Sequence, residues 1–327
     1  MQIGSACAQK GKVSLGSVPV AELCDSTRVE VPIVIVQGHE PGPCLWIQNG
    51  VHGDELVGVG AIHKLIDWVG TYDIRGTLVM VPMLNIMAFR AGQRMAPQDG
   101  LDMNRIWPGA PLDKAMHLWA HSELVVDAFV GYMRDVADAV IDVHCSGLMG
   151  QMSPYACYYT GGGDLEEKVR KLAYASGMSL IWETQASWVS EKVPGSLKTE
   201  MGKAGIPSVT LEVGGESKLI SGDVDRMFKA LTNTMKHLGM VDGQPELPEE
   251  QILVRKGHWL RASRGGLLWQ YCRRLRQVSA GELLAETKDL YGHVIEEFRA
   301  PVDGICVGFS TLGTVQTGMY VANVGSV

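Results

Sequence analysis

The sequence predicts an α/β fold, in which a mixed, mostly parallel sheet is flanked by helices and followed by a small C-terminal β domain. Short runs rich in β-branched residues alternate with longer amphipathic segments as far as residue 237, which is typical of such sheets. The chain has 327 residues, of which 46% are hydrophobic, enough to bury a large core. After residue 251 the pattern changes to short strands separated by Gly and Asp turns.

The elements of the first unit follow from this alternation. Strands are expected at 32–38 ("PIVIVQG"), 44–50 ("CLWIQNG"), 76–84 ("GTLVMVPML"), 138–144 ("DAVIDVH"), 155–160 ("YACYYT"), 180–184 ("LIWET") and 208–215 ("SVTLEVGG"). Helices are expected at about 56–69, 114–134, 165–176 and 224–237.

A linker separates the two predicted units. Residues 239–251, "GMVDGQPELPEEQ", are rich in Pro, Gly and Glu. We therefore assign 1–243 to the α/β domain and 252–327 to a small β domain. The spacing of strands and turns in this second unit is similar to that of a lipoyl-like half-barrel. A carrier role is disfavoured because Lys288, the nearby lysine, lies too far before the Ala300-Pro301 turn. A wall for the active-site cleft or a homodimer contact is the preferred role.

Charge and cysteine content exclude several classes of protein. The net charge of -7, with Lys and Arg scattered along the chain, disfavours nucleic acid and anionic membranes as partners. The seven cysteines form no CxxC pair and are read as reduced thiols. No segment resembles a signal peptide or a membrane span, so a cytoplasmic location is expected.

Ionisable residues stand at the ends of three predicted strands. "QNGVHGDE" contributes His52 and Glu55, "VIDVHCSG" contributes His144, and "VTLEVGG" contributes Glu212. Strand ends of this fold class converge at one edge of the sheet. Two imidazoles and one carboxylate make a three-ligand zinc site with an open position for water. Glu212 is then the candidate general base.

His-x-x-Glu alone is a common pattern, and the surrounding motifs strengthen it. The order His-Gly-Asp-Glu, Asp-x-Asn-Arg-x-x-Pro-Gly, Asp-x-His and Glu-x-Gly resembles the succinylglutamate desuccinylase/aspartoacylase family of carboxypeptidase-A-like zinc hydrolases, over roughly 32–237. The resemblance implies one zinc per chain on His52, Glu55 and His144, with Glu212 as base and proton shuttle. It also implies that Arg94 polarises the scissile carbonyl and that Asn104 and Arg105 grip the substrate carboxylate.

Several assignments stay open at this stage. Arg90 is an alternative to Arg94, because both lie in the segment before the Asn-Arg motif. Asp142 would share the strand face of His144 and could fix its tautomer, or could serve only the fold. Cys145 should point to the opposite face. His117 and His121, one helical turn apart, are read as part of a half-buried helix rather than as a metal site.

The leading function is a zinc amidohydrolase that deacylates a small N-acyl amino acid. A zinc carboxypeptidase acting on small peptides is the alternative, and a non-catalytic zinc-binding regulatory module is disfavoured because Glu212 supplies a base. Aspartoacylases carry a further arginine before the catalytic Glu that reads a second carboxylate, whereas this chain has only Lys198 and Lys203 there. The sequence therefore favours a neutral or basic substrate, such as acetylated diaminobutyrate.

Overall fold

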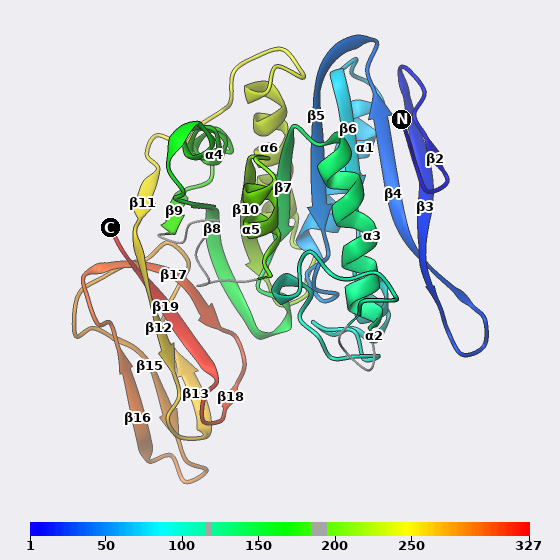
Figure 1. Ribbon diagram of the computed structural model, residues 1–327. Helices are drawn as coiled ribbons and strands as arrows, with labels where there is room; N and C mark the ends of the chain where they lie inside the picture. The colour runs from blue at the N-terminus through cyan, green and yellow to red at the C-terminus, as the bar shows by residue number, and fades with distance from the viewer. Residues whose placement is uncertain (116–119, 185–194) are drawn as a thin grey trace.

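A computed structural model describes residues 1–115, 120–184 and 195–327. Within these ranges a large mixed sheet of thirteen strands forms the centre of the molecule, with N-terminal strands at one edge and C-terminal strands at the other (Figure 1). Its strands are β3 (Lys12–Glu22), β4 (Arg28–Gln37), β5 (Glu40–Asn49), β6 (Arg75–Val81), β7 (Ala139–His144), β8 (Gly150–Tyr159), β9 (Leu180–Thr184), β10 (Ser208–Gly215), β11 (Ile252–Val254), β12 (Lys256–Arg261), β14 (Gln277–Val278), β17 (Gly304–Ser310) and β19 (Tyr320–Ser326).

The predicted fold class is confirmed, and the parallel pairing lies at the centre of the sheet. β6, β5, β7 and β10 are neighbours in that order and run parallel. β8 is antiparallel to β10, while β9 pairs in parallel with β8. β3 and β4 form a long antiparallel hairpin at the other edge. The sequence did not predict β3, because Gly16, Ser17 and Pro19 interrupt its apolar residues.

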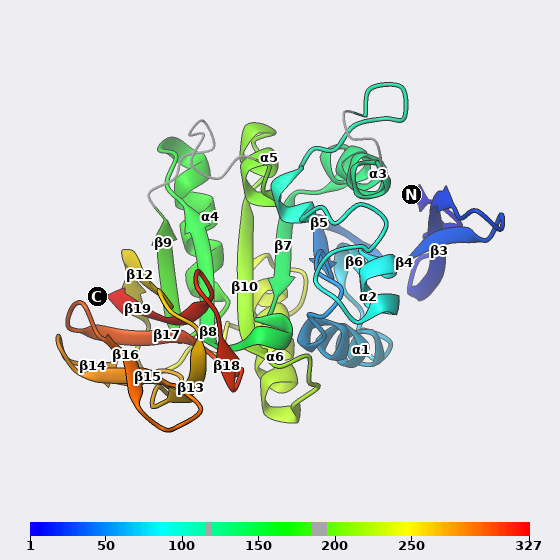
Figure 2. The same ribbon diagram turned by 90° about the horizontal axis from the view of Figure 1, so that it is seen from below.

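Helices cover both faces of the sheet. They are α1 (Val57–Val69), α2 (Ile86–Ala91), α3 (His121–Val136), α4 (Gly163–Ala175), α5 (Leu197–Lys203) and α6 (Ser221–His237). α1 and α6 lie on one side, and α3 and α5 lie on the other (Figure 2). α2 and α5 were missed because each has fewer than two turns of periodic sequence. In the described ranges, no helix has the length and apolar composition needed to cross a membrane.

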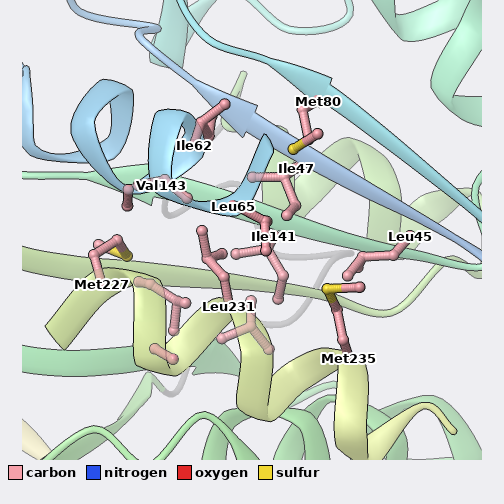
Figure 3. Packing of buried hydrophobic residues seen from close by; sticks show 14 of the residues in the cluster. Leu45, Ile47, Ile62, Leu65, Met80, Ile141, Val143, Met227, Leu231 and Met235 are labelled. Atoms are coloured by element: carbon pink, nitrogen blue, oxygen red, sulfur yellow. The ribbon is translucent and has the colours of Figure 1, made fainter. Parts of the chain in front are cut away.

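The main core lies between the sheet and the helices α1, α4 and α6. Ile141 of β7 packs here with Leu65 of α1 and with Leu231 and Met235 of α6 (Figure 3). Side chains alternate along a strand, so the residues between these core positions, such as Asp142, face the other side of the sheet. That side carries α3, α5 and the polar residues of the candidate site.

The C-terminal strands continue the main sheet. β17 pairs with β8 and is followed by β19 and β12. A second sheet lies below, in the order β16 (Val294–Arg299), β15 (Leu283–Lys288), β13 (Gly266–Gln270) and β18 (Thr314–Val315). The C-terminal strands enclose a separate apolar cluster that includes Leu284 and Phe298. A short N-terminal hairpin is formed by β1 (Gln2–Ile3) and β2 (Ala6–Cys7).

Candidate active site

Glycines shape the turn between β5 and α1 that carries His52 and Glu55. Gly50 has φ +73°, a left-handed conformation that side chains disfavour, and a Cβ there would lie 2.5 Å from Met83 Sδ. A Cβ on Gly53 would lie 2.2 Å from the backbone of α2. The glycines therefore permit a sharp turn packed directly against α2. The turn presents both His52 and Glu55 as buried side chains.

Strand register places Glu212 beside His144. In the parallel β7–β10 pair these two residues are direct partners, and in the antiparallel β10–β8 pair Glu212 is opposite Tyr155. Tyr155 donates a hydrogen bond from its hydroxyl to Glu212 Oε2 at 2.7 Å. The predicted convergence of the strand ends is thus present in the structure.

Three buried side chains form the one group in the described ranges whose ligand atoms could hold a metal: His52, Glu55 and His144. One ligand atom from each residue lies within 4.8 Å of the others. His52 Nδ1 is 2.7 Å from Glu55 Oε1, and His144 Nδ1 is 2.8 Å from Glu55 Oε2. Both imidazoles therefore turn their Nδ1 atoms toward the carboxylate of Glu55. His117 lies outside the described residues, so the structure does not bear on its pairing with His121.

Each histidine meets an aspartate at its far nitrogen. His52 Nε2 lies 3.0 Å from Asp102 Oδ1, and His144 Nε2 lies 2.9 Å from Asp142 Oδ2. The contact of His52 is a hydrogen bond, and such an acceptor fixes the tautomer and orientation of a histidine that ligates a metal. The contact of His144 has ion-pair distance but not hydrogen-bond geometry. The sequence analysis left open whether Asp142 contacts His144, and it did not predict the contact of Asp102 with His52. Asp102 is the first residue of the Asp-x-Asn-Arg motif, and its position there was the signal in the sequence.

Arg94 lies in the site and Arg90 does not line it. Arg94 Nη1 donates to Glu55 Oε1 at 3.2 Å, and Nη2 donates to Asp102 Oδ2 at 3.1 Å. Burial lowers the pKa of Arg94, but the charges of Glu55 and Asp102 raise it by more. Arg90 instead contacts Met87 on α2 at 3.8 Å. The guanidinium of Arg94 is thus a fixed positive charge beside the group that could hold a metal.

Asn104 and Arg105 lie at the rim of the same cavity. They belong to a short 3-10 helix, Met103–Arg105, which begins with Asp102 accepting a hydrogen bond from the Asn104 amide. Asn104 Oδ1 accepts from the backbone N–H of Leu197, the first residue of α5. Arg105 is exposed and donates to the carbonyl of Asn104 at 2.7 Å. Arg105 thus combines solvent exposure with a place in the cavity lining.

The environment of Glu212 suits a proton acceptor. Burial and the nearby charge of Glu55 raise its pKa above the ordinary value, although His144 and the Tyr155 hydrogen bond oppose the shift. A general base works best when its pKa approaches the working pH. Cys145, by contrast, turns its side chain into the hydrophobic core, and its backbone N–H donates to Glu55 Oε2 at 3.2 Å.

One cavity of about 450 Å³ is lined by the predicted site residues, which are His52, Glu55, Arg94, Asn104, Arg105, His144 and Glu212. Trp259 and Arg261 of β12 and Tyr320 of β19 also line it, so the C-terminal strands form one wall. Lys198 of α5 lines the cavity too. The sequence analysis gave a cleft wall or a dimer contact as the role of the C-terminal unit. It did not identify Trp259, Arg261 or Tyr320, because the pairing of β17 with β8 that brings them to the cavity leaves no local pattern.

Comparison with known proteins agrees with this geometry. The model of the succinylglutamate desuccinylase/aspartoacylase catalytic domain matches residues 41–238. An N-alpha-acetyl-L-2,4-diaminobutyric acid deacetylase of Halomonas elongata is 27% identical over 310 residues, which cover 91% of this chain and 86% of the relative.

Solved structures extend the similarity to the whole chain. The product-bound ectoine utilization protein EutE (DoeB) of Ruegeria pomeroyi has a TM-score of 0.84 and 25% identity, covering 97% of this chain and 95% of that chain. A succinylglutamate desuccinylase of Silicibacter sp. TM1040 has a TM-score of 0.83 and 24% identity, covering 96% and 95%. With its catalytic-domain match spanning more than half of its length, the chain belongs to the succinylglutamate desuccinylase/aspartoacylase family.

Proposed function

We propose that this chain is a zinc-dependent hydrolase that removes the acyl group from a small N-acyl amino acid. The observation that carries the proposal is the convergence of His52, Glu55 and His144 beside Glu212 in one cavity. Family membership and the deacetylase relative support the same reaction class.

The donor set fits zinc. Two imidazole nitrogens and a carboxylate are a ligand combination of catalytic zinc sites, and each histidine has an aspartate behind it. His52, Glu55 and His144 would hold the ion. When bound, zinc supplies Lewis acidity, which lowers the pKa of water and polarises a carbonyl group.

The chain's own residues supply proton transfer and charge stabilisation. Glu212 would accept a proton from the attacking water and return it to the nitrogen of the leaving amine, for which its raised pKa is suited. Arg94, held by Glu55 and Asp102, would stabilise the negative charge that develops on the carbonyl oxygen. Asn104 and Arg105 would bind the carboxylate of the amino acid.

The cavity favours a small substrate over a peptide. Its volume of about 450 Å³ is in the lower part of the range for small-molecule sites. Trp259 and Tyr320 from the C-terminal strands add two large aromatic side chains to the cavity wall. We therefore prefer a deacylase to a small-peptide carboxypeptidase.

The test uses purified, zinc-loaded protein and a panel of N-acetyl and N-succinyl amino acids, with release of free amine as the readout. We expect turnover of at least one class of N-acyl amino acid. Glu212→Gln should retain stoichiometric zinc and lose at least about a hundredfold in rate, whereas Glu249→Gln, at an exposed position of the linker, should change neither. Full activity in the Glu212→Gln protein would refute the assigned base.

A further inference from the structure

The pairing of β8 with β10 has a bulge directly beside Glu212. Glu212 is opposite Tyr155 and Gly214 is opposite Met152, so between these pairs β8 has two residues where β10 has one. Such a bulge changes the direction of the neighbouring side chains, and bulges are common next to active sites. Met152 and Tyr155 accordingly both line the cavity. The bulge therefore helps to set the place of Glu212 and of the Tyr155 hydroxyl that is bonded to it.

A turn of the C-terminal unit is attached to the β8 side of this bulge. Ser153, the first of the two bulged residues, is fully buried. Its hydroxyl donates to the carbonyl of Cys306 on β17 at 2.7 Å and accepts from the backbone N–H of Leu275 at 2.9 Å. Leu275 lies in the turn between β13 and β14. The hydroxyl of Ser153 thus joins β8 to two segments of the C-terminal unit at once.

The same turn is attached to the β10 side of the bulge. Arg274 Nη1 lies 2.6 Å from Asp223 Oδ1, and the side chain of Asp223 is only 6% exposed. Asp223 belongs to the first turn of α6. A Cβ on Gly214 would lie 2.6 Å from Asp223 Oδ2, so this carboxylate packs directly against the backbone of β10. Two neighbouring residues, Arg274 and Leu275, therefore hold both strands of the bulge.

The turn has a backbone conformation that its sequence does not favour. Leu275 adopts φ +59°, a left-handed conformation that is unfavourable for a bulky side chain. Such a conformation persists only where the surrounding contacts enforce it, and examples cluster at functional sites. Here the contacts are the bond to Ser153 and the packing of Leu275 against the apolar cluster that includes Met152 and Tyr155. The catalytic domain thus holds the turn in this one conformation.

We infer that the turn of Arg274 and Leu275 is a positioning element for the general base Glu212. It acts through Asp223 and Ser153, which hold the two strands of the bulge. The inference rests on the proposed function. Neither residue of the turn lines the cavity, so the turn acts without touching substrate. A misplacement of a reacting group by about 1 Å, caused by a remote substitution, can lower a rate by about a hundredfold.

The first test compares kcat, KM and zinc affinity of variants on an N-acyl amino acid that the wild type hydrolyses. Arg274→Met removes the cationic partner of Asp223 beside β10, and kcat should fall by about tenfold or more. KM and zinc affinity should stay near the wild-type values, because the proposed zinc ligands lie outside β8 and β10. Arg273→Met, at an exposed position of the same turn, is the matched control and should change none of the three. An unchanged kcat in Arg274→Met would overturn the inference.

A double-mutant cycle separates positioning of the base from a general loss of stability. If Arg274 acts through Glu212, Arg274→Met should lower kcat little further in the Glu212→Gln protein, whereas independent effects would multiply. Equal losses in the two backgrounds would overturn the inference. Ser153→Ala removes the hydroxyl on the β8 side and should likewise lower kcat without raising KM. If Arg274→Met does not fold, as judged by circular dichroism, Ser153→Ala decides by the same criteria.

Hydrogen–deuterium exchange tests the inference without turnover. In Arg274→Met the backbone amides of β8 and β10 should exchange faster, whereas those of β6, which β7 and β5 separate from β10, should not change. Unchanged exchange in all three strands, or an equal increase in all three, would overturn the inference. If the wild type hydrolyses no N-acyl amino acid, the proposed function is refuted. A local increase in exchange would then still support the coupling of the turn to Glu212 and Tyr155.

Discussion

Replacing Asp102 by Asn should weaken zinc binding although Asp102 is not a proposed ligand. Its carboxylate accepts from His52 Nε2 at 3.0 Å, from Arg94 Nη2 at 3.1 Å and from the Asn104 amide at 2.9 Å. Burial raises the pKa of Asp102, but the hydrogen bonds and charges of His52 and Arg94 lower it by more, to well below the ordinary range. The group is therefore ionised at neutral pH.

The expected size of the effect follows from these three donors. Asparagine keeps one oxygen, which can continue to accept from His52 and from the Asn104 amide. Its new NH₂ group would then face Arg94, so a charge-assisted hydrogen bond is replaced by a contact between two donors. The negative charge behind His52 is also lost. Removing such a partner typically costs about 10- to 100-fold in metal affinity, or about 1.4 to 2.7 kcal/mol.

The assay is a zinc titration against a chromophoric chelator at neutral pH, with thermal unfolding of the metal-free proteins as the folding check. Asp113→Asn, which removes an exposed carboxylate from the loop that follows the Asn-Arg motif, is the matched control and should bind zinc like the wild type. If Asp102→Asn and wild type have the same zinc affinity, Asp102 does not orient His52 and its contact is only structural.

Three further substitutions test the proposed general base Glu212, the proposed carboxylate-binding residue Arg105 and the packing of the hydrophobic core. Tyr155→Phe removes a hydrogen bond that lowers the pKa of Glu212, so this pKa should rise. The acidic limb of the pH profile of kcat/KM should then move to higher pH, and an unmoved limb would contradict a role for this hydrogen bond. Arg105→Lys should lower kcat/KM by about tenfold or more, about 1.4 kcal/mol, for N-acyl amino acids. The matching amino-acid amides should barely change, and equal losses for acid and amide would show that Arg105 does not read the carboxylate. Leu231→Ala, in the fully buried core of α6, should reduce the free energy of unfolding by about 2 to 5 kcal/mol in urea titrations, and a loss below this range would argue against tight packing there.

Local patterns in the sequence predicted the parts of the molecule that depend on local structure. β5, β7 and β10 are apolar strands with ionisable residues near their carboxyl ends, so both the sheet and the convergence of His52, His144 and Glu212 could be inferred. The α2 and α5 helices could not, since they are too short for periodicity and are held by contacts with distant segments. α5, for example, begins at Leu197, which is bonded to Asn104 across 93 positions of sequence.

The residues missed in the site share a physical cause. Asp102 contacts His52 and Arg94, and Trp259 and Tyr320 reach the cavity on the C-terminal strands, so the place of each depends on neighbours that are remote in sequence. A lysine is ordinarily an exposed residue. The packing of α5 against β7 and β10 shows that Lys198 is enclosed in the cavity wall.

Strand register connects the stability of the core to the chemistry of the site. Along β7, Ile141 and Val143 pack into the main core, while Asp142 and His144 lie on the other face and His144 lines the cavity. Along β10, Leu211 and Val213 alternate with Glu212 in the same way. A slip of one residue between strands would turn a polar side chain into the core and an apolar one into the cavity. The apolar positions thus hold Glu212 opposite His144 without contacting substrate. Core substitutions that preserve alternation should therefore lower stability before they lower the activity of the folded molecules, whereas a polar residue at Val143 or Leu211 should reduce both together.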